Sequence, residues 1–474
     1  MDLLRVKPVE PTTAEENPLR RELGSLQLTL LGIGCIVGTG IFVITGTAAA
    51  QHAGPAIVLS FIVSALGCLC AGFCYAELAS MIPLCGSAYT YAYSTIGEIF
   101  AWIIGWDLIL EYLVGSATVA VGWSAYMVSF LSGIGIQFPA VLANAPFVFK
   151  DGWAVSGAII NLPAVLIVLA VSVLLIIGIR ESSGVNAIIV AIKVVLIILF
   201  IVFCFPYVHP ANWVPFIPPS TGFGQFGWTG IMAGAGVIFY AYIGFDAVTT
   251  AAQETKKPQR DLPIGILGSL LICTILYVLV SLVLTGVVNY KQLDVAAPVA
   301  FAIQQVGASV AWLRPLVELG AIAGITSVIL VLLLGQPRIF YRMAVDGLLP
   351  KVFTKVHSTF KTPHVTTAVT GIVAATLAGL FPIGVLSELV SIGTLLAFVI
   401  VCISVMVLRK TRPDIPRLFK TPLVPFVPIV GAILCFAQMV FLPPNTWIRL
   451  VIWLIIGLAI YFGYGYRKSR LNRR

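Results

Sequence analysis

Long uncharged apolar stretches recur along almost the whole chain, from Leu26 to Tyr466. About 20 such residues cross the hydrocarbon core of a membrane as a helix, and only helices or closed barrels satisfy the backbone there. The stretches are much longer than barrel strands, so the sequence predicts an all-α bundle of membrane-spanning helices. Charged residues make up only 10% of the 474 residues, against about 25% in soluble domains.

Hydropathy divides the chain into about twelve spans between two polar tails. Residues 1–25 carry both charge signs and lack an apolar run, so we expect a cytoplasmic tail, not a signal peptide. A second cytoplasmic tail is expected over residues 467–474. The expected spans are 26–49, 55–82, 98–130, 163–179, 184–206, 228–252, 264–288, 312–345, 366–381, 386–408, 424–441 and 448–466.

The net charge of +9 is explained by membrane topology. With the N-terminus inside, 23 of the 28 Lys and Arg fall on the cytoplasmic side, and Lys193 falls within a span. Because cytoplasmic loops are enriched in Lys and Arg, this distribution places both termini in the cytoplasm. We therefore expect contact with membrane lipid and no nucleic-acid partner. The basic residues expected outside are Lys150, Lys291, Arg314 and Arg449.

The residue types that support catalysis or metal binding are dispersed. The nine cysteines lie nearly all within spans, without disulfide or zinc-ligand spacing, and the four histidines are scattered. The chain also lacks the GxxxxGK[ST] motif of ATP-driven proteins. The sequence therefore predicts no enzyme, no metal site and no cofactor.

Two apolar segments are interrupted by glycines at the middle of their spans. Gly32–Phe42 reads GIGCIVGTGIF, and Gly234–Asp246 reads GAGVIFYAYIGFD. Small residues that allow close helix packing are the alternative for either segment alone. Because each segment opens a block of five spans, the pair is typical of an inverted-repeat transporter. We expect a first repeat over 26–206, a second over 207–408, and two added spans over 409–466.

Several motifs resemble the amino acid–polyamine–organocation (APC) superfamily, and within it bacterial members of the cationic amino acid transporter family. The resemblance implies a LeuT-like fold with helices 1 and 6 broken, secondary active transport of amino acids by alternating access, and a bacterial cytoplasmic membrane. A small membrane-protein partner would leave no trace in this sequence. The motifs are GIGCIVGTGIF, PLCGSAYTYAYSTIGE, GWDLILEYLVGSATVAVGWS, FYAYIGFDAVTTAAQETKKPQRDLPIGI and PRIFYRMAVDGLLPKVF.

A free amino acid is a zwitterion, and a low-dielectric site must neutralise both of its charges. The second half of a broken helix 1 offers unpaired amides to the carboxylate, and a broken helix 6 offers carbonyls to the ammonium. Tyr240 is expected either to cover the ligand or simply to pack. By resemblance, Leu332 replaces a smaller residue of cationic-substrate members, which favours small neutral substrates such as alanine. The predicted substrate residues are Ile36, Thr39, Gly40, Tyr240, Ala241, Ile243 and Leu332.

Ionisable side chains within spans are costly and indicate function. The resemblance places Lys193 where sodium-coupled relatives hold a cation between helices 1, 5 and 8, which favours proton coupling or no coupling ion. We predict Glu111 as the proton carrier, with Asp107 one turn away on the same face and Asp246 after the second break. A static ion pair or a purely structural polar contact between helices is the alternative, and the hydroxyls of Thr326–Ser327 keep a sodium site open. Uniport, exchange of cationic amino acids and a non-transporting sensor also remain open.

Overall fold

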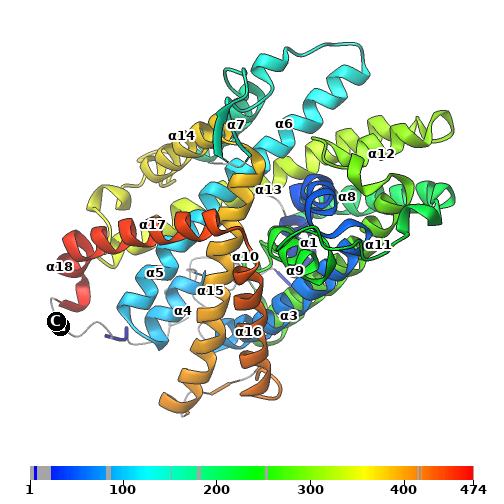
Figure 1. Ribbon diagram of the computed structural model, residues 1–474. Coiled ribbons are helices and arrows are strands. Elements are labelled where there is room, and N and C mark those ends of the chain that lie inside the picture. Colours follow the sequence, from blue (N-terminus) through cyan, green and yellow to red (C-terminus); the bar gives the residue numbers. More distant parts are fainter. Residues whose placement is uncertain are drawn as a thin grey trace.

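The computed structural model describes residues 5–7, 23–81, 87–150, 152–178, 183–250, 255–413, 416–417 and 419–472, which form a helical bundle (Figure 1). Eight of the described helical stretches are long and apolar enough to cross a membrane, and four shorter helices are also apolar. The prediction of a helical membrane protein is therefore confirmed. The long stretches are Gly40–Met81, Glu98–Gly133, Asn186–Tyr207, Gly227–Thr249, Pro258–Val287, Leu313–Val345, Ile383–Thr411 and Pro444–Lys468, and the shorter ones are Ser25–Ile36, Leu162–Ile177, His364–Leu380 and Phe426–Val440.

The first expected span is interrupted. Helix α1 (Ser25–Ile36) ends before two non-helical residues, and the chain then resumes a helical path through a wide turn at Gly40–Ile44 and α2 (Thr45–Ala48). The backbone reverses at Gly54, whose φ of +59° favours glycine. Helix α3 (Ile57–Met81) follows. The long stretch Gly40–Met81 therefore consists of two helices.

The sixth expected span is also interrupted. Helix α9 (Gly227–Ile238) tightens into a 3₁₀ turn at Phe239–Tyr242, and the short helix α10 (Ala247–Thr250) follows. Between them, Gly244 has a φ of +112°, and a Cβ at this position would lie 2.9 Å from Cβ of Cys35. The break thus requires glycine both for its backbone conformation and for its close contact with helix α1.

The third expected span crosses without a break but widens in its middle. Helix α4 (Ser87–Thr95) precedes it, and α5 (Glu98–Ile109) passes through a π-helical turn at Leu110–Val114 into α6 (Gly115–Gly133). Single π-helical turns inside α-helices are frequent at functional sites. This one contains the predicted proton carrier, Glu111.

The remaining helices surround these three spans. Helices α1 and α3 both pack against α11, α6 packs against α13, α7 against α14, and α16 against α3 and α15. The short helices α4 and α12 were not predicted. The bounds are α7 (Leu162–Ile177), α8 (Ser183–Cys204), α11 (Pro258–Val287), α12 (Pro298–Val306), α13 (Leu313–Val345), α14 (His364–Leu380), α15 (Ile383–Thr411), α16 (Phe426–Val440), α17 (Pro444–Ile460) and α18 (Tyr466–Lys468).

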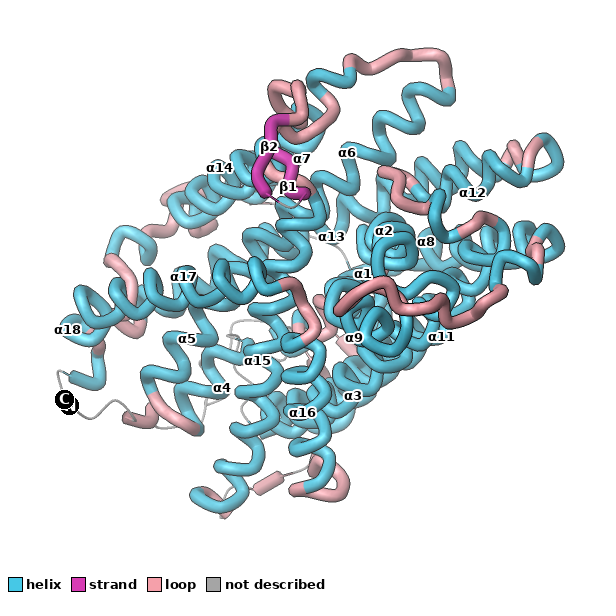
Figure 2. Tube along the Cα trace, viewed as in Figure 1, coloured by secondary structure: helices cyan, strands magenta, loops and turns pink. Residues whose placement is uncertain are grey.

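One small β-hairpin lies in the connection between α6 and α7 (Figure 2). Its strands, β1 (Phe147–Lys150) and β2 (Gly152–Val155), pair antiparallel. The guanidinium carbon of Arg449, in the second turn of α17, lies 4.8 Å from the centre of the Phe149 ring. The hairpin is therefore attached to the body of the bundle, although the sequence interpretation placed no element there.

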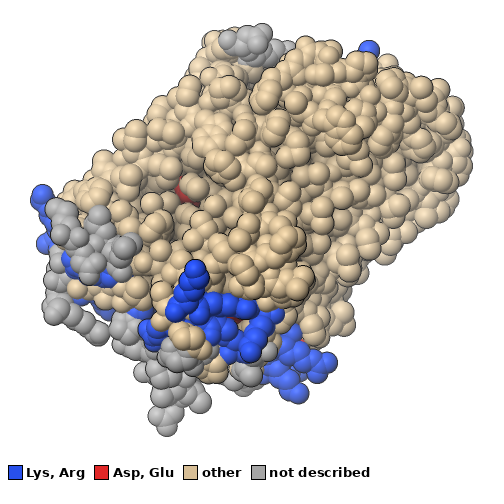
Figure 3. Space-filling model, turned by 60° about the horizontal axis from the view of Figure 1, so that its bottom comes forward, with Lys and Arg blue, Asp and Glu red and all other residues tan. Residues whose placement is uncertain are grey.

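Lys and Arg side chains gather at one end of the face shown in Figure 3, while most of that face is uncharged. Glu77, at one end of α3, is only 1% exposed and accepts two hydrogen bonds from Arg409, of 3.0 and 2.8 Å. The backbone amide of Thr421 donates a third, at 2.7 Å. These bonds hold the end of α15 and the connection to α16 against α3.

Candidate substrate and coupling site

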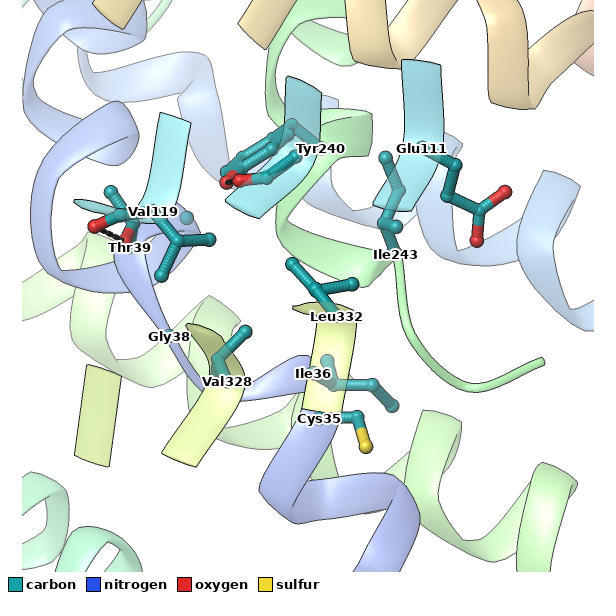
Figure 4. Close-up of a pocket in the computed structure, with 12 residues that line it drawn as sticks. Cys35, Ile36, Gly38, Thr39, Glu111, Val119, Tyr240, Ile243, Val328 and Leu332 are labelled. Atoms are coloured by element: carbon teal, nitrogen blue, oxygen red, sulfur yellow. Dashed lines mark hydrogen bonds between the residues drawn. The ribbon is translucent and has the colours of Figure 1, made fainter. Parts of the chain in front are cut away.

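A small cavity of about 20 Å³ lies between the two interrupted helices (Figure 4). This is room for about one water molecule, far below the range of ligand pockets, about 300–1,000 Å³, so the cavity is nearly closed in this structure. Six of the seven predicted substrate residues line it, and Ala241 is the exception. The lining residues are Cys35, Ile36, Gly38, Thr39, Gly40, Glu111, Gly115, Val119, Tyr240, Ile243, Val328 and Leu332.

The two interrupted helices touch at Gly40. A Cβ at Gly40 would lie 2.3 Å from Cα of Ala241, closer than any real contact. Ala241 therefore packs against helix 1 and is not among the residues that line the cavity. This backbone contact requires glycine at position 40. It also places the start of the second half of helix 1 directly beside the break in helix 6.

Thr39 begins the second half of helix 1, so the first amides of this half have no partner one turn earlier in the helix. Its hydroxyl donates to the carbonyl oxygen of Val119 at 3.3 Å, which turns it toward α6 (Figure 4). A Cβ at Gly122 would lie 2.2 Å from the Thr39 methyl group. Helix α6 thus packs against the break in helix 1. Because the Thr39 hydroxyl is bonded to Val119, the backbone amides at this break are the groups that could bind an anion.

Two side chains satisfy the carbonyls at the end of α1. The Lys193 ammonium donates to the carbonyl oxygens of Gly34 and Val37, at 2.8 and 3.1 Å. The Tyr277 hydroxyl lies 2.8 Å from the carbonyl oxygen of Ile36 and 3.0 Å from that of Ala241, so it connects both breaks. A cation at a helix C-terminus is stabilised by the helix dipole.

The methylene chain of Lys193 also occupies the space beside Gly324, where the sodium alternative would place the ion. A Cβ at Gly324 would lie 2.7 Å from Cε of Lys193. The Thr326 hydroxyl donates to the Ile322 carbonyl, and the Ser327 hydroxyl donates to the Gly324 carbonyl. In the described part of the chain, Lys193 forms no ion pair with a carboxylate. The described residues therefore show no static ion pair of this lysine, while its bonds to the carbonyls of helix 1 are polar contacts between helices.

The carboxyl groups of Glu111 and Asp246 lie close together, near the second break. The Tyr112 hydroxyl donates to Oδ2 of Asp246 at 3.2 Å, and within the described part of the chain Oδ1 of Asp246 and Oε2 of Glu111 have no hydrogen-bond partner. Two ionised carboxylates near each other repel strongly in a buried site, so the pair is favourable when it shares a proton. Glu111 lines the cavity, whereas Asp107, one turn away, is buried with no hydrogen-bond partner for either oxygen among the described residues.

A family model described as amino acid permease matches residues 23–461 of the chain. The chain belongs to the amino acid permease family. This permease is therefore a multi-pass membrane transporter and not an enzyme, and the resemblance to APC transporters is confirmed.

Relatives of the permease cover most of its length. It is 47% identical to the methylthioribose transporter of Bacillus subtilis (strain 168), over 99% of both chains. It is 48% identical to the branched-chain amino acid permease BcaP of the same organism, over 97% of this chain and 96% of the relative. Human cationic amino acid transporter 4 is 32% identical, over 100% of this chain and 91% of the relative.

The sequence interpretation missed several residues of the permease site. Val119 and Val328 line the cavity, and Tyr277 connects the two breaks from a third helix. Valines inside apolar spans carry no sequence signal that distinguishes a ligand contact from packing. A tyrosine in the middle of a span does carry one, because its buried hydroxyl requires a hydrogen-bond partner.

Proposed function

We propose that this permease is a proton-coupled symporter of small and branched aliphatic L-amino acids that works by alternating access. The observation that carries the proposal is one cavity that joins both helix breaks and has the Glu111 carboxyl group in its wall. Glu111 in turn lies near Asp246, which follows the second break. Substrate and proton would therefore occupy neighbouring positions.

The backbone ends around the cavity suit the two charges of an amino acid. The amides that follow Thr39 and Gly40 carry the positive end of a helix dipole and would hold the carboxylate. The carbonyls around Tyr240 and Ile243 would accept the ammonium group. The side chain of the ligand would then lie against Leu332 and the two valines of the wall, an environment that favours an aliphatic group over a charged one.

We propose a LeuT-like arrangement of two inverted repeats, over 26–206 and 207–408, followed by two helices over 409–466. Support comes from the placement of a broken helix at the start of each proposed repeat. The basic end seen in Figure 3 would face the cytoplasm of a bacterial cell, together with both termini.

Lys193 would supply a positive charge where a sodium ion is held in other carriers of this architecture. Glu111 would then carry the coupling proton, and its contact with Asp246 would break or form as the cavity changes the side to which it opens. Asp107 would provide a further acceptor one turn away along the same helix.

Transport in proteoliposomes tests the proposal. With an imposed inward proton gradient, the native protein should accumulate alanine and leucine, whereas Glu111→Gln should exchange labelled for unlabelled substrate without accumulating it. Asp294→Asn is the matched control, because Asp294 is exposed, bonds Gln51 and does not line the cavity.

Accumulation driven by a sodium gradient at constant pH, or undiminished accumulation by Glu111→Gln, would contradict proton coupling. Methylthioribose belongs in the same panel, because one relative bears the name of a transporter for it. Counterflow of methylthioribose without counterflow of any amino acid would contradict the substrate class.

A further inference from the structure

One buried amide side chain on α13 has no hydrogen-bond partner in the part of the chain that the structure describes. Gln336 is fully buried, and neither its Nε2 nor its Oε1 forms a hydrogen bond there. A buried polar group without a partner is costly, and such a group in a native protein requires an explanation. An apolar side chain of similar size would pack equally well without this cost. The amide at position 336 therefore indicates a function other than packing.

The packing of α13 against helix 3, which runs from α5 to α6, places Gln336 level with Glu111. A Cβ at Gly115 would lie 3.6 Å from Cδ1 of Leu332, so these two residues face each other at the cavity. Gln336 comes one turn after Leu332 on α13, and Glu111 comes one turn before Gly115 on helix 3. Residues four apart share a helix face, so Gln336 and Glu111 lie on the facing sides of two antiparallel helices.

Two further contacts establish this antiparallel register. A Cβ at Gly335 would lie 2.6 Å from Cδ1 of Tyr112, and a Cβ at Gly105 would lie 2.8 Å from Cε of Met343. Positions that come later on α13 are thus opposite positions that come earlier on helix 3, over more than two turns. The level of Glu111 on α13 therefore follows from three independent pairs of residues.

Helix α15 brings a second donor without a partner to the same level. A Cβ at Gly115 would lie 3.9 Å from Cγ1 of Val390, and Thr394, one turn later on α15, lies close to the Glu111 carboxyl group. Thr394 is buried, and its hydroxyl has no hydrogen-bond partner within the described ranges. In Figure 4 the carboxyl group of Glu111 points away from Tyr240. Two buried donors and an acceptor oxygen thus lie at one depth of the bundle.

The carboxyl group that lies near Glu111 in this structure belongs to a different group of helices. Asp246 directly precedes α10, which packs against α1, α3 and α11. Glu111 and Gln336 belong to helix 3 and α13, which pack against each other. Alternating access requires one group to move against the other. Such a movement separates Asp246 from Glu111 and leaves Gln336 beside it.

We propose that Gln336 is the positioning residue that donates a hydrogen bond to the Glu111 carboxylate once Asp246 has moved away, with Thr394 as a second donor. The inference rests on the proposed proton coupling and deepens it. Donors to the ionised form of a carboxyl group favour that form, so these two bonds stabilise Glu111 after its proton has left. Because the bonds form in only one state of the cycle, they couple the movement of the helices to proton release.

Other titratable groups near Glu111 do not replace these donors. Tyr75 of α3 and Cys35 of α1 belong to the group that moves with Asp246, and the Tyr112 hydroxyl is bonded to Asp246. In the described parts of α13 and α15 no charged side chain faces Glu111 at this level, because Arg338 is exposed. The titratable groups around Glu111 are Asp107, Asp246, Tyr75, Tyr112 and Cys35.

Infrared difference spectra of the full-length protein in liposomes, recorded as a function of pH with isotope-labelled glutamate, test the contact. The carbonyl band of protonated Glu111 is the one that Glu111→Gln removes. Gln336→Met removes the donor and keeps the size of the side chain. It should raise the pH at which half of this band is lost by about one unit, a tenfold tighter hold on the proton. Thr394→Val should shift the midpoint in the same direction, and Gln336→Asn, which keeps an amide, should shift it less.

Gln304→Met is the matched control, since Gln304 is exposed on α12 and does not line the cavity. An unchanged midpoint in Gln336→Met, which is what a packing role predicts, or an equal rise in Gln304→Met would overturn the inference. The titration does not require transport. A raised midpoint in Gln336→Met, with no proton-driven alanine accumulation by the native protein, would support the contact and refute the proposed function. An unchanged midpoint alongside such accumulation would refute the contact and support the proposed function.

Discussion

Gly115 offers a direct test of the substrate cavity, because a methyl group fits there without disturbing the protein. A Cβ at this position would lie 3.6 Å from Cδ1 of Leu332 and 3.9 Å from Cγ1 of Val390, both ordinary contact distances. Gly115→Ala should therefore fold normally and place its methyl group in the cavity. Losing room for one methylene in an apolar pocket costs a ligand about 1–3 kcal/mol, roughly 10- to 200-fold in affinity.

Calorimetric titration of the purified protein with alanine and with leucine measures this effect. We expect Gly115→Ala to raise the Kd of leucine at least tenfold, while the Kd of alanine changes by less than about threefold. Gly384→Ala is the control, because nothing lies within 4 Å of a Cβ at that position. Equal changes for both amino acids, or no change for leucine, would refute the assignment of this cavity to the substrate side chain.

Two further predictions concern backbone contact and buried charge. Gly40→Ala should abolish binding of every amino acid in the same titration, because its Cβ would lie 2.3 Å from Cα of Ala241 and force the two breaks apart; retained binding would show that the breaks do not form the site. Arg409→Met should lower stability by about 3 kcal/mol in thermal unfolding, since it removes two bonds from the buried Glu77 carboxylate. The exposed neighbour Lys410, changed to Met, should have little effect, and equal effects would argue against this ion pair.

The helix interruptions could be predicted because their cause is local. Glycine is required where the backbone adopts a left-handed conformation, as at Gly244, or where another backbone comes within contact distance, as at Gly40. Six of the seven predicted substrate residues accordingly line one cavity. The contact of Ala241 with helix 1 depends on the relative placement of two distant segments, which local sequence does not indicate.

Other features depended on tertiary contacts or on a signal that was not used. Nothing local in the sequence indicates that Tyr277 of α11 reaches the ends of two other helices, or that Lys193 bonds carbonyls and not a carboxylate. The hairpin of β1 and β2 could have been predicted, because an Asp-Gly pair at 151–152 separates two alternating runs. Hydropathy alone does not detect so short an element outside the spans.

The ammonium of Lys193 has a practical consequence for handling the protein. Because this amino group is covalently part of the chain and donates to carbonyls at the end of α1, those carbonyls keep their hydrogen-bond donor whatever salt the buffer contains. Replacing sodium by choline throughout purification should therefore leave the melting temperature unchanged.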